Sequence, residues 1–295
     1  RPRHNSSGIG QIKKAIQLYK PTHYIYDART GSQNWFIGMI QAFRIAILFQ
    51  VHGIVPVCIL TDLPVRSWRR QTSMVSAKRG VVISLMSPKD IHSIFPHSRI
   101  TGPLLMPFSK ARLNNLSELS TKNRNSETTS CIFLGSLYEP RTTILKEISE
   151  GLNKKGITLE IKGRELGTKK PSEDQYWTRL MDASIVITTA DQIESKDSDW
   201  TWIPHLIYRY LEVPIAGSLL VAQEVPSLSR YFSPGIHYVK YDSINDAIEK
   251  ITYYMENKEE MDQITKCGFE KATNIVKSNL YWVVIDNALG KYSLK

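Results

Sequence analysis

Residues 208–220 read YRYLEVPIAGSLL. Arg209 and Glu212 stand three residues apart, ahead of a proline, a glycine and a second apolar run. Residues three apart share one face of a helix, so the pattern predicts a helix over 203–213 that leads into a strand over 217–225. The two charges would then lie together beside the helix–strand turn.

The same alternation of short apolar runs and helical segments continues along most of the chain. Apolar runs at 54–60 and 81–87 are followed by helical patterns, and so are runs at 130–136 and 184–190. Such alternation is typical of parallel sheets with right-handed crossovers, whose ligands bind at the carboxyl ends of the strands. The sequence therefore predicts an α/β fold with two doubly wound, Rossmann-like domains that face a cleft.

A polar stretch separates the two series. Residues 109–129 are rich in Ser, Asn and Thr and lack periodicity, which is typical of a linker. We predict a first domain over 1–108, a second over 130–277, and a C-terminal helix over 278–295 that packs back on the first domain. The first series has about four predicted strands, whereas doubly wound domains have five or six, and the chain starts with Arg rather than Met, so we expect the first domain to be incomplete.

The amino-acid composition indicates which binding partners and which cell compartment to expect. The net charge is +10 and the pI is about 9.4, which favours anionic partners such as phosphate-bearing ligands, nucleic acid or a membrane surface. Three widely spaced cysteines indicate reduced thiols. The most apolar region, residues 35–60, is interrupted by polar side chains and does not read as a membrane span. We expect a cytoplasmic protein that can lie peripherally at the inner membrane face.

Five segments, in order, resemble the C-terminal nucleotide-sugar domain of GT-B glycosyltransferases. They are FLGSLYEPR, a strand that ends in IKGR, YWTRLMDASIVITTA, the helix that carries Arg209 and Glu212, and an F-x-P-G-x-x-x-V-x-Y segment from Phe232 to Tyr241. The set is most similar to the group-1 branch that includes the CgeB-like proteins. The resemblance covers residues 130–285 of the chain. The resemblance implies a GT-B glycosyltransferase with the donor on the second domain and the acceptor on the first.

The helix of the opening motif supplies the ribose-binding group in this resemblance. A carboxylate such as Glu212 can accept hydrogen bonds from both ribose hydroxyls, and the family places a glutamate there. Arg209, one turn back, would hold Glu212 or reach a phosphate, and the small-residue turn at Gly217 belongs to the same donor site. The alternative is a surface ion pair between the two, worth a few tenths of a kcal/mol.

The strand ends of the second series supply the other donor-site candidates. Gly135 and Ser136 end a strand in a small-residue turn that lets backbone N–H groups approach phosphate. Arg141 opens the next helix, where the family often has a basic residue on the pyrophosphate; the alternative is a solvated arginine.

Two further strand ends complete the donor site. Arg164 would lie beside the base or contact a phosphate, unless it is only a positively charged loop residue. Thr188 and Thr189 would line the base slot, unless they are ordinary strand-end hydroxyls.

The catalytic groups are less well defined by the sequence. Many retaining members carry a second glutamate eight residues before the ribose-binding one, but position 204 is a proline, so the stereochemical outcome stays open. His205 is a candidate at the donor, and Asp27 is the first candidate for a general base because it ends a strand of the first series. Structural alternatives are a histidine at a helix start and an aspartate that caps the next element.

No metal ion or other cofactor is expected. The DSD triplet at 197–199 lies in a polar loop rather than at a strand end. GT-B enzymes generally steady the leaving nucleotide diphosphate with cationic side chains and helix ends instead of a metal.

The basic segment RSWRR at 66–70 suggests a second kind of partner. It could hold a lipid-linked acceptor at an anionic membrane surface or could be a solvated basic helix. No segment resembles a named nucleic-acid module, so nucleic acid is an improbable partner.

The sequence thus predicts transfer of a sugar from a nucleotide diphosphate sugar to a hydroxyl of a glycan, lipid-linked or protein acceptor, within polysaccharide biosynthesis. Two alternatives stay open. One is a non-catalytic nucleotide- or sugar-binding domain of a larger polysaccharide-building protein, and the other is a nucleotide-sugar epimerase.

Overall fold

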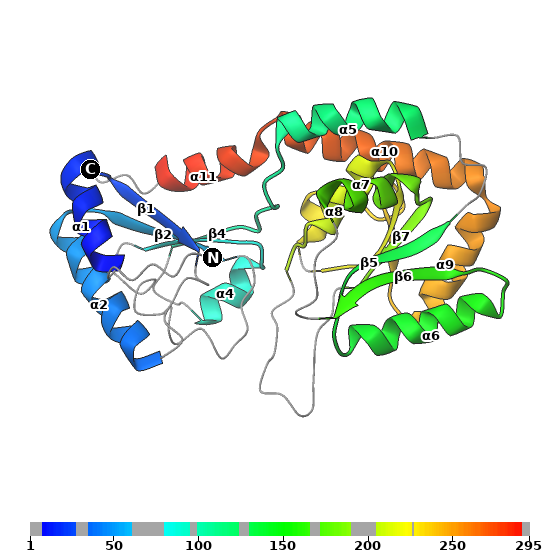
Figure 1. Ribbon diagram of the computed structural model, residues 1–295, viewed down its shortest axis with the longest axis horizontal. Helices are drawn as coiled ribbons and strands as arrows, with labels where there is room; N and C mark the ends of the chain where they lie inside the picture. Colours follow the sequence, from blue (N-terminus) through cyan, green and yellow to red (C-terminus); the bar gives the residue numbers. More distant parts are fainter. Residues whose placement is uncertain are drawn as a thin grey trace. The chain divides into compact units, whose positions relative to one another are not determined.

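The computed structural model describes residues 8–27, 35–60, 80–94, 99–123, 130–165, 172–189, 205–225 and 227–290 (Figure 1). Contacts between Cα atoms divide the chain into two units. Unit 1 comprises Arg1–Leu104 and Val284–Lys295, and unit 2 comprises Leu105–Val283. Each unit holds its own parallel sheet, so the predicted α/β class is confirmed.

Unit 1 is built on a four-stranded parallel sheet in the order β1-β2-β3-β4. The central strands are buried almost completely, as expected for a parallel sheet that is covered on both faces. Its strands are β1 (His23–Asp27), β2 (Val55–Leu60), β3 (Val81–Ser84) and β4 (Arg99–Thr101), and its helices include α1 (Gly8–Tyr19), α2 (Trp35–Val51) and α4 (Pro88–Ile94).

Unit 2 contains a five-stranded parallel sheet in the order β6-β5-β7-β8-β9. The chain moves from β5 outward to β6, then returns to the other side of β5 for β7. The order therefore reverses between β5 and β7, which is the topological switch point of a doubly wound sheet. The strands are β5 (Cys131–Leu137), β6 (Leu159–Glu165), β7 (Ile185–Thr188), β8 (Leu219–Gln223) and β9 (Val239–Tyr241).

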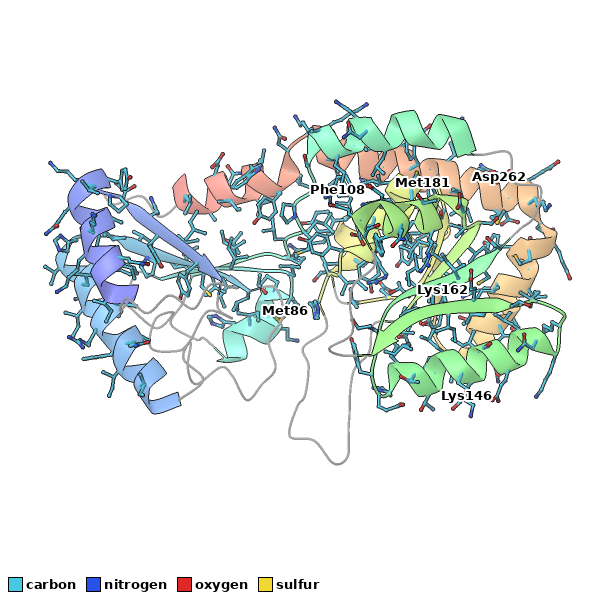
Figure 2. All side chains as sticks on the ribbon, viewed as in Figure 1. Met86, Phe108, Lys146, Lys162, Met181 and Asp262 are labelled. Atoms are coloured by element: carbon cyan, nitrogen blue, oxygen red, sulfur yellow. The ribbon has the colours of Figure 1, made fainter. Side chains whose placement is uncertain are left out.

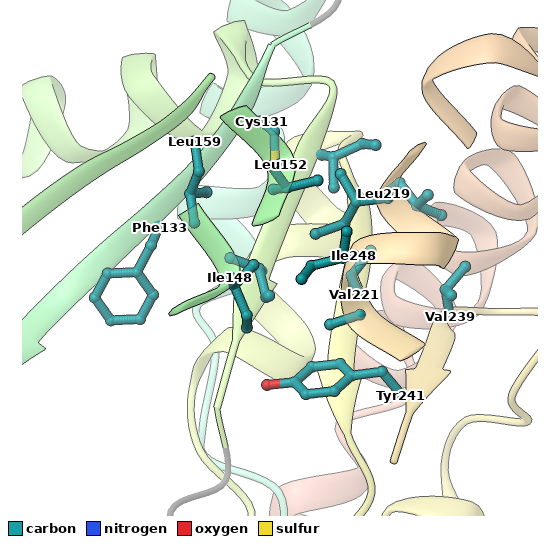
Figure 3. Close-up of a cluster of buried hydrophobic side chains, with 14 of the residues drawn as sticks. Cys131, Phe133, Ile148, Leu152, Leu159, Leu219, Val221, Val239, Tyr241 and Ile248 are labelled. Atoms are coloured by element: carbon teal, nitrogen blue, oxygen red, sulfur yellow. The ribbon is translucent and has the colours of Figure 1, made fainter. Parts of the chain in front are cut away.

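Helices pack on this sheet through apolar faces of helical period. On α6, Leu145, Ile148 and Leu152 are buried against β5 residues such as Cys131 and Phe133 (Figure 3). Lys146 extends from the opposite side of α6, away from the sheet (Figure 2). The helices of unit 2 are α5 (Lys110–Asn123), α6 (Arg141–Asn153), α7 (Glu173–Asp182), α8 (Arg209–Ala216), the 3₁₀ turn η2 (Leu228–Arg230), α9 (Ile244–Glu256) and α10 (Lys258–Lys277). Helix α11 (Leu280–Gly290) crosses the division between the units.

The predicted linker is wrong over most of its length. Residues 110–123 form helix α5, which packs on α7, α8 and α10. Leu113 and Leu116 are buried, three residues apart on one side of the helix. Its other positions are mainly polar, so the apolar side was too narrow to stand out from the Ser- and Asn-rich composition.

Among the helices in the described part of the chain, none has the length and apolar character needed to cross a bilayer.

Candidate functional site

The site is organised around the switch point of unit 2. Strands β5 and β7 pair at Cys131↔Ile185 and Ile132↔Val186, near their start, and this is the full extent of their recorded ladder. Beyond these pairs the two strands continue to their carboxyl ends at Leu137 and Thr188. A crevice at this position is where doubly wound sheets bind their ligands.

Arg141 joins the carboxyl ends of β5 and β7. It is the first residue of α6 and is 8% exposed. Its Nε donates to Thr189 Oγ1 at 3.0 Å, Nη1 donates to the carbonyl of Ser136 at 3.1 Å, and Nη2 donates to the carbonyl of Thr189 at 3.4 Å. The guanidinium carbon also lies 4.3 Å from the ring centroid of Tyr138. The alternative of a solvated arginine is wrong, and contact with a pyrophosphate stays a prediction.

Gly135 and Arg209 are brought together from separate segments. A Cβ atom built on Gly135 would lie 2.9 Å from Nη2 of Arg209. Arg209 begins α8, so its guanidinium reaches across to the end of β5 and lies against the backbone there. Glycine at 135 leaves the room that this approach requires. Nε of Arg209 is buried and has no hydrogen-bond partner among the described residues.

Glu212 lies one turn further along α8 and is partly buried. Its Oε2 accepts a hydrogen bond from the hydroxyl of Tyr176 on α7, at 2.7 Å. Burial raises the pKa of Glu212, while Arg209, the Tyr176 hydroxyl and Arg112 of α5 act in the opposite direction. Glu212 is therefore part of a buried polar network and not half of a surface ion pair.

Tyr176 is a residue of this site that sequence reasoning missed. It follows the Ser172–Gln175 capping box that begins α7, and its neighbour Trp177 is buried against Phe108. The sequence offered only an aromatic pair near the start of an amphipathic helix. Nothing in that pattern connects Tyr176 with a carboxylate on another helix.

Thr188 and Thr189 lie at the same carboxyl edge but have structural partners. Thr188 and Thr189 are both buried. The carbonyl of Thr188 accepts a hydrogen bond from the hydroxyl of Tyr241 at 3.1 Å, and Thr189 is bonded to Arg141. Gly217 has φ 78° and ψ 29° at the end of α8, a left-handed conformation that glycine adopts without strain. It precedes the start of β8, at the amino edge of the sheet, so the structure does not bring it together with Gly135, Arg141 and Thr189.

Several of the predicted site residues and segments lie partly or wholly outside the residues that the structure describes. The backbones of Asp27 and Arg164 end or nearly end β1 and β6, but their side chains are outside the described residues. The segments 197–199 and 66–70 are outside them altogether. His205 is partly buried and precedes α8. Over the ranges given for the fold, no cluster of three His, Cys, Asp or Glu side chains is arranged to hold a metal ion.

Removing the Tyr176 hydroxyl is expected to make stability more dependent on pH. In Tyr176→Phe the buried carboxylate of Glu212 loses a donor, so its pKa should rise further. Consider a carboxyl group whose pKa is higher in the folded protein than in the unfolded protein. It leaves the stability of the protein unchanged below the unfolded-state pKa, and that stability is lost as the pH rises through the folded-state pKa. We expect the variant to lose about 1.5 kcal/mol relative to wild type near pH 8 and much less near pH 4.

Urea unfolding at both pH values measures this difference. Tyr253→Phe is the matched control, because Tyr253 donates to Glu260 at 2.6 Å on the exposed surface. We expect no measurable change in the control. An equal loss at both pH values would show that the Tyr176 hydroxyl does not act through the ionised carboxylate.

Comparisons with known proteins relate this geometry to a fold. Residues 146–278 match the protein-family model described as glycosyl transferase-like. No curated protein sequence is significantly similar to the chain. Among solved structures, HepE from Anabaena in complex with UDP and glucose has a TM-score of 0.58 at 10% identity, covering 95% of this chain and 83% of that one.

Two other solved structures are similar at the level of the fold. A mutant TarM from S. aureus, in a complex that includes UDP, has a TM-score of 0.52 at 10% identity over 86% of this chain, which spans 59% of the TarM chain. A glycosyltransferase from Rickettsia africae has a TM-score of 0.50 at 12% identity, over 96% of this chain and 87% of that one. These neighbours are GT-B glycosyltransferases, and the predicted GT-B fold is confirmed.

Proposed function

We propose that the protein is a glycosyltransferase that moves a sugar from a nucleotide diphosphate sugar to a hydroxyl group of an acceptor. The observation that carries the proposal is the meeting of Gly135, Arg209 and Glu212 at the carboxyl edge of the unit 2 sheet. The glycosyl transferase-like match includes the helix that supplies Arg209 and Glu212. UDP is the first nucleotide to test, because it is bound in the HepE and TarM structures.

Each residue has a role that its surroundings support. Glu212 accepts hydrogen bonds from the ribose hydroxyls, and Tyr176 fixes the orientation of its carboxylate. Arg209 directs its buried Nε–H toward the diphosphate, in a place where limited water strengthens charge-assisted hydrogen bonds. Arg141 keeps the ends of β5 and β7 at a fixed separation, and Gly135 leaves the room in which the Arg209 guanidinium lies.

In the proposed reaction, the acceptor oxygen bonds to the anomeric carbon of the donor sugar. The bond from that carbon to the diphosphate oxygen breaks, and the nucleotide diphosphate leaves with the electron pair. A base takes the acceptor proton, for which Asp27 is the candidate. Cationic side chains such as Arg209 steady the leaving charge, so the proposal includes no metal ion. The acceptor is a glycan, a lipid-linked sugar or a protein.

Calorimetric titration of UDP, GDP, ADP, CMP and dTDP into wild type and Glu212→Gln tests the donor site. We expect saturable binding of one nucleotide diphosphate, weakened at least about tenfold in Glu212→Gln, because an amide replaces an ionised acceptor. Glu249→Gln, at an exposed position of α9, is the matched control and should bind as wild type does.

Transfer is tested with the corresponding nucleotide sugars and an acceptor panel, by following release of the nucleotide diphosphate. Failure of wild type to bind any of the nucleotides would refute the proposal. Binding without release from any nucleotide sugar would identify a non-catalytic donor-binding domain instead.

A further inference from the structure

Helix α2 of unit 1 exposes an apolar face. Its opposite side is buried through Ala42 and Phe49, and Phe49 packs with Ile16 of α1. A surface helix normally turns polar residues outward and hides its apolar stripe. On α2 the outward side is instead occupied by large apolar residues spaced three or four apart, with exposed fractions of 43–74%: Ile37, Ile40, Phe43, Ile47 and Val51.

The core of unit 1 does not account for this face. Ala42 and Phe49 are almost fully buried and attach the helix to unit 1, whereas the five outward side chains keep 43–74% of their surface exposed. Contiguous exposed apolar residues are costly in water and mark surfaces that meet another apolar phase or partner. We call these five residues the α2 face.

The charge of the chain is concentrated in the unit that carries the α2 face. Residues 1–104 and 284–295 hold 16 Lys and Arg but 4 Asp and Glu, a net charge of +12. Residues 105–283 hold 22 Lys and Arg and 24 Asp and Glu, which gives a net charge of −2. Helix α2 contains no acidic residue, and Arg44 is exposed among the residues of the α2 face. On neighbouring α1, Lys13 and Lys14 are exposed as well.

The exposed apolar residues and the positive charge together distinguish between possible partners of the α2 face. A second copy of the chain would bring two strongly basic units together, which like-charge repulsion opposes. Nucleic acid is held by cations and by stacking or hydrogen-bonding side chains, and gains little from Ile and Val. A bilayer with anionic lipids offers both acyl chains for the α2 face and negative headgroups for the basic side chains around it.

We propose that α2 lies in the interface of an anionic membrane, with the α2 face inserted among the lipids and with Arg44, Lys13 and Lys14 at the headgroups. The proposal does not depend on the function proposed for unit 2. It assigns unit 1 a membrane-docking surface and thereby favours acceptors that are held at a membrane.

Vesicle cosedimentation tests the proposal, without nucleotide or sugar. Wild type should bind phosphatidylcholine vesicles that contain about one third phosphatidylserine at least about tenfold more tightly than pure phosphatidylcholine vesicles, since each basic residue near the surface adds to the attraction. Phe43→Gln/Ile47→Gln should bind the anionic vesicles at least about tenfold more weakly, because two apolar side chains no longer insert. Arg44→Gln should weaken binding about fivefold.

The matched control is Ile236→Gln/Tyr253→Gln. It replaces one aliphatic and one aromatic side chain of comparable exposure in unit 2, 55% and 46%, and should bind as wild type does. Equal binding by Phe43→Gln/Ile47→Gln and wild type would overturn the proposal, as would no preference for anionic vesicles. A dimer seen by light scattering that this double variant abolishes, without vesicle binding by wild type, would assign the α2 face to a second copy instead.

Discussion

Replacing Arg141 with methionine is expected to lower the free energy of unfolding by about 3 kcal/mol or more. The guanidinium bonds the carbonyls of Ser136 and Thr189 and the hydroxyl of Thr189. Methionine fills a similar volume but donates no hydrogen bond, so buried acceptors at the ends of two strands lose their partner. Each unsatisfied buried acceptor costs about 1–3 kcal/mol.

Urea unfolding followed by tryptophan fluorescence, to which Trp177 of unit 2 contributes, measures this loss. Arg179→Met, at an exposed position of α7, is the control and should change stability little. Arg141→Lys should recover little of the loss, because an ammonium group cannot reproduce the planar donor fork that spans β5 and β7. A loss below about 1 kcal/mol in Arg141→Met would mean that the strand ends are held by other contacts.

Gly268→Ala is expected to destabilise unit 2 by about 2 kcal/mol. Gly268 lies inside α10, where alanine alone would favour the helix by up to about 1 kcal/mol. The added Cβ, however, would lie 2.5 Å from the carbonyl oxygen of His237, and a backbone atom cannot rotate away. Helix α10 packs on α8, so the helix that carries Arg209 would be pushed or tilted as well.

Two other helical glycines provide controls for this prediction. At Gly151 the new Cβ would meet the flexible end of Ile248, and at Gly290 it would meet no atom within 4 Å. Chemical denaturation should therefore show the largest loss of stability in Gly268→Ala and a smaller loss in Gly151→Ala. Gly290→Ala should be close to neutral or stabilising. A neutral Gly268→Ala would contradict the close packing of α10 on the chain before β9.

Local patterns determined much of the fold. Short apolar runs predicted β2, β3, β5 and β7, because parallel strands buried on both faces need continuous apolar residues. The start of α7 is also encoded locally, because the two hydrogen bonds of the capping box at Ser172 join residues three apart. Each of these signals is complete within a few neighbouring residues.

Tertiary structure decided what the candidate site residues do. The sequence placed Arg209 and Glu212 on one helix, but it could not show that Arg209 lies against Gly135 or that Glu212 is bonded to Tyr176. It also left Arg141 open between a solvated and a ligand-binding role. These contacts join segments far apart in the chain, and no spacing rule connects such residues.

Helix α5 and the α2 face illustrate the same division. Composition indicated a linker over 109–129, because the apolar side of α5 gains meaning only when α7, α8 and α10 are present to cover it. The sequence did not show which apolar residues of α2 stay exposed, since hydrophobicity alone does not say which side of a helix meets the sheet. Local sequence sets which elements form, whereas packing between distant elements sets which side chains are buried, which are paired and which remain exposed for a partner.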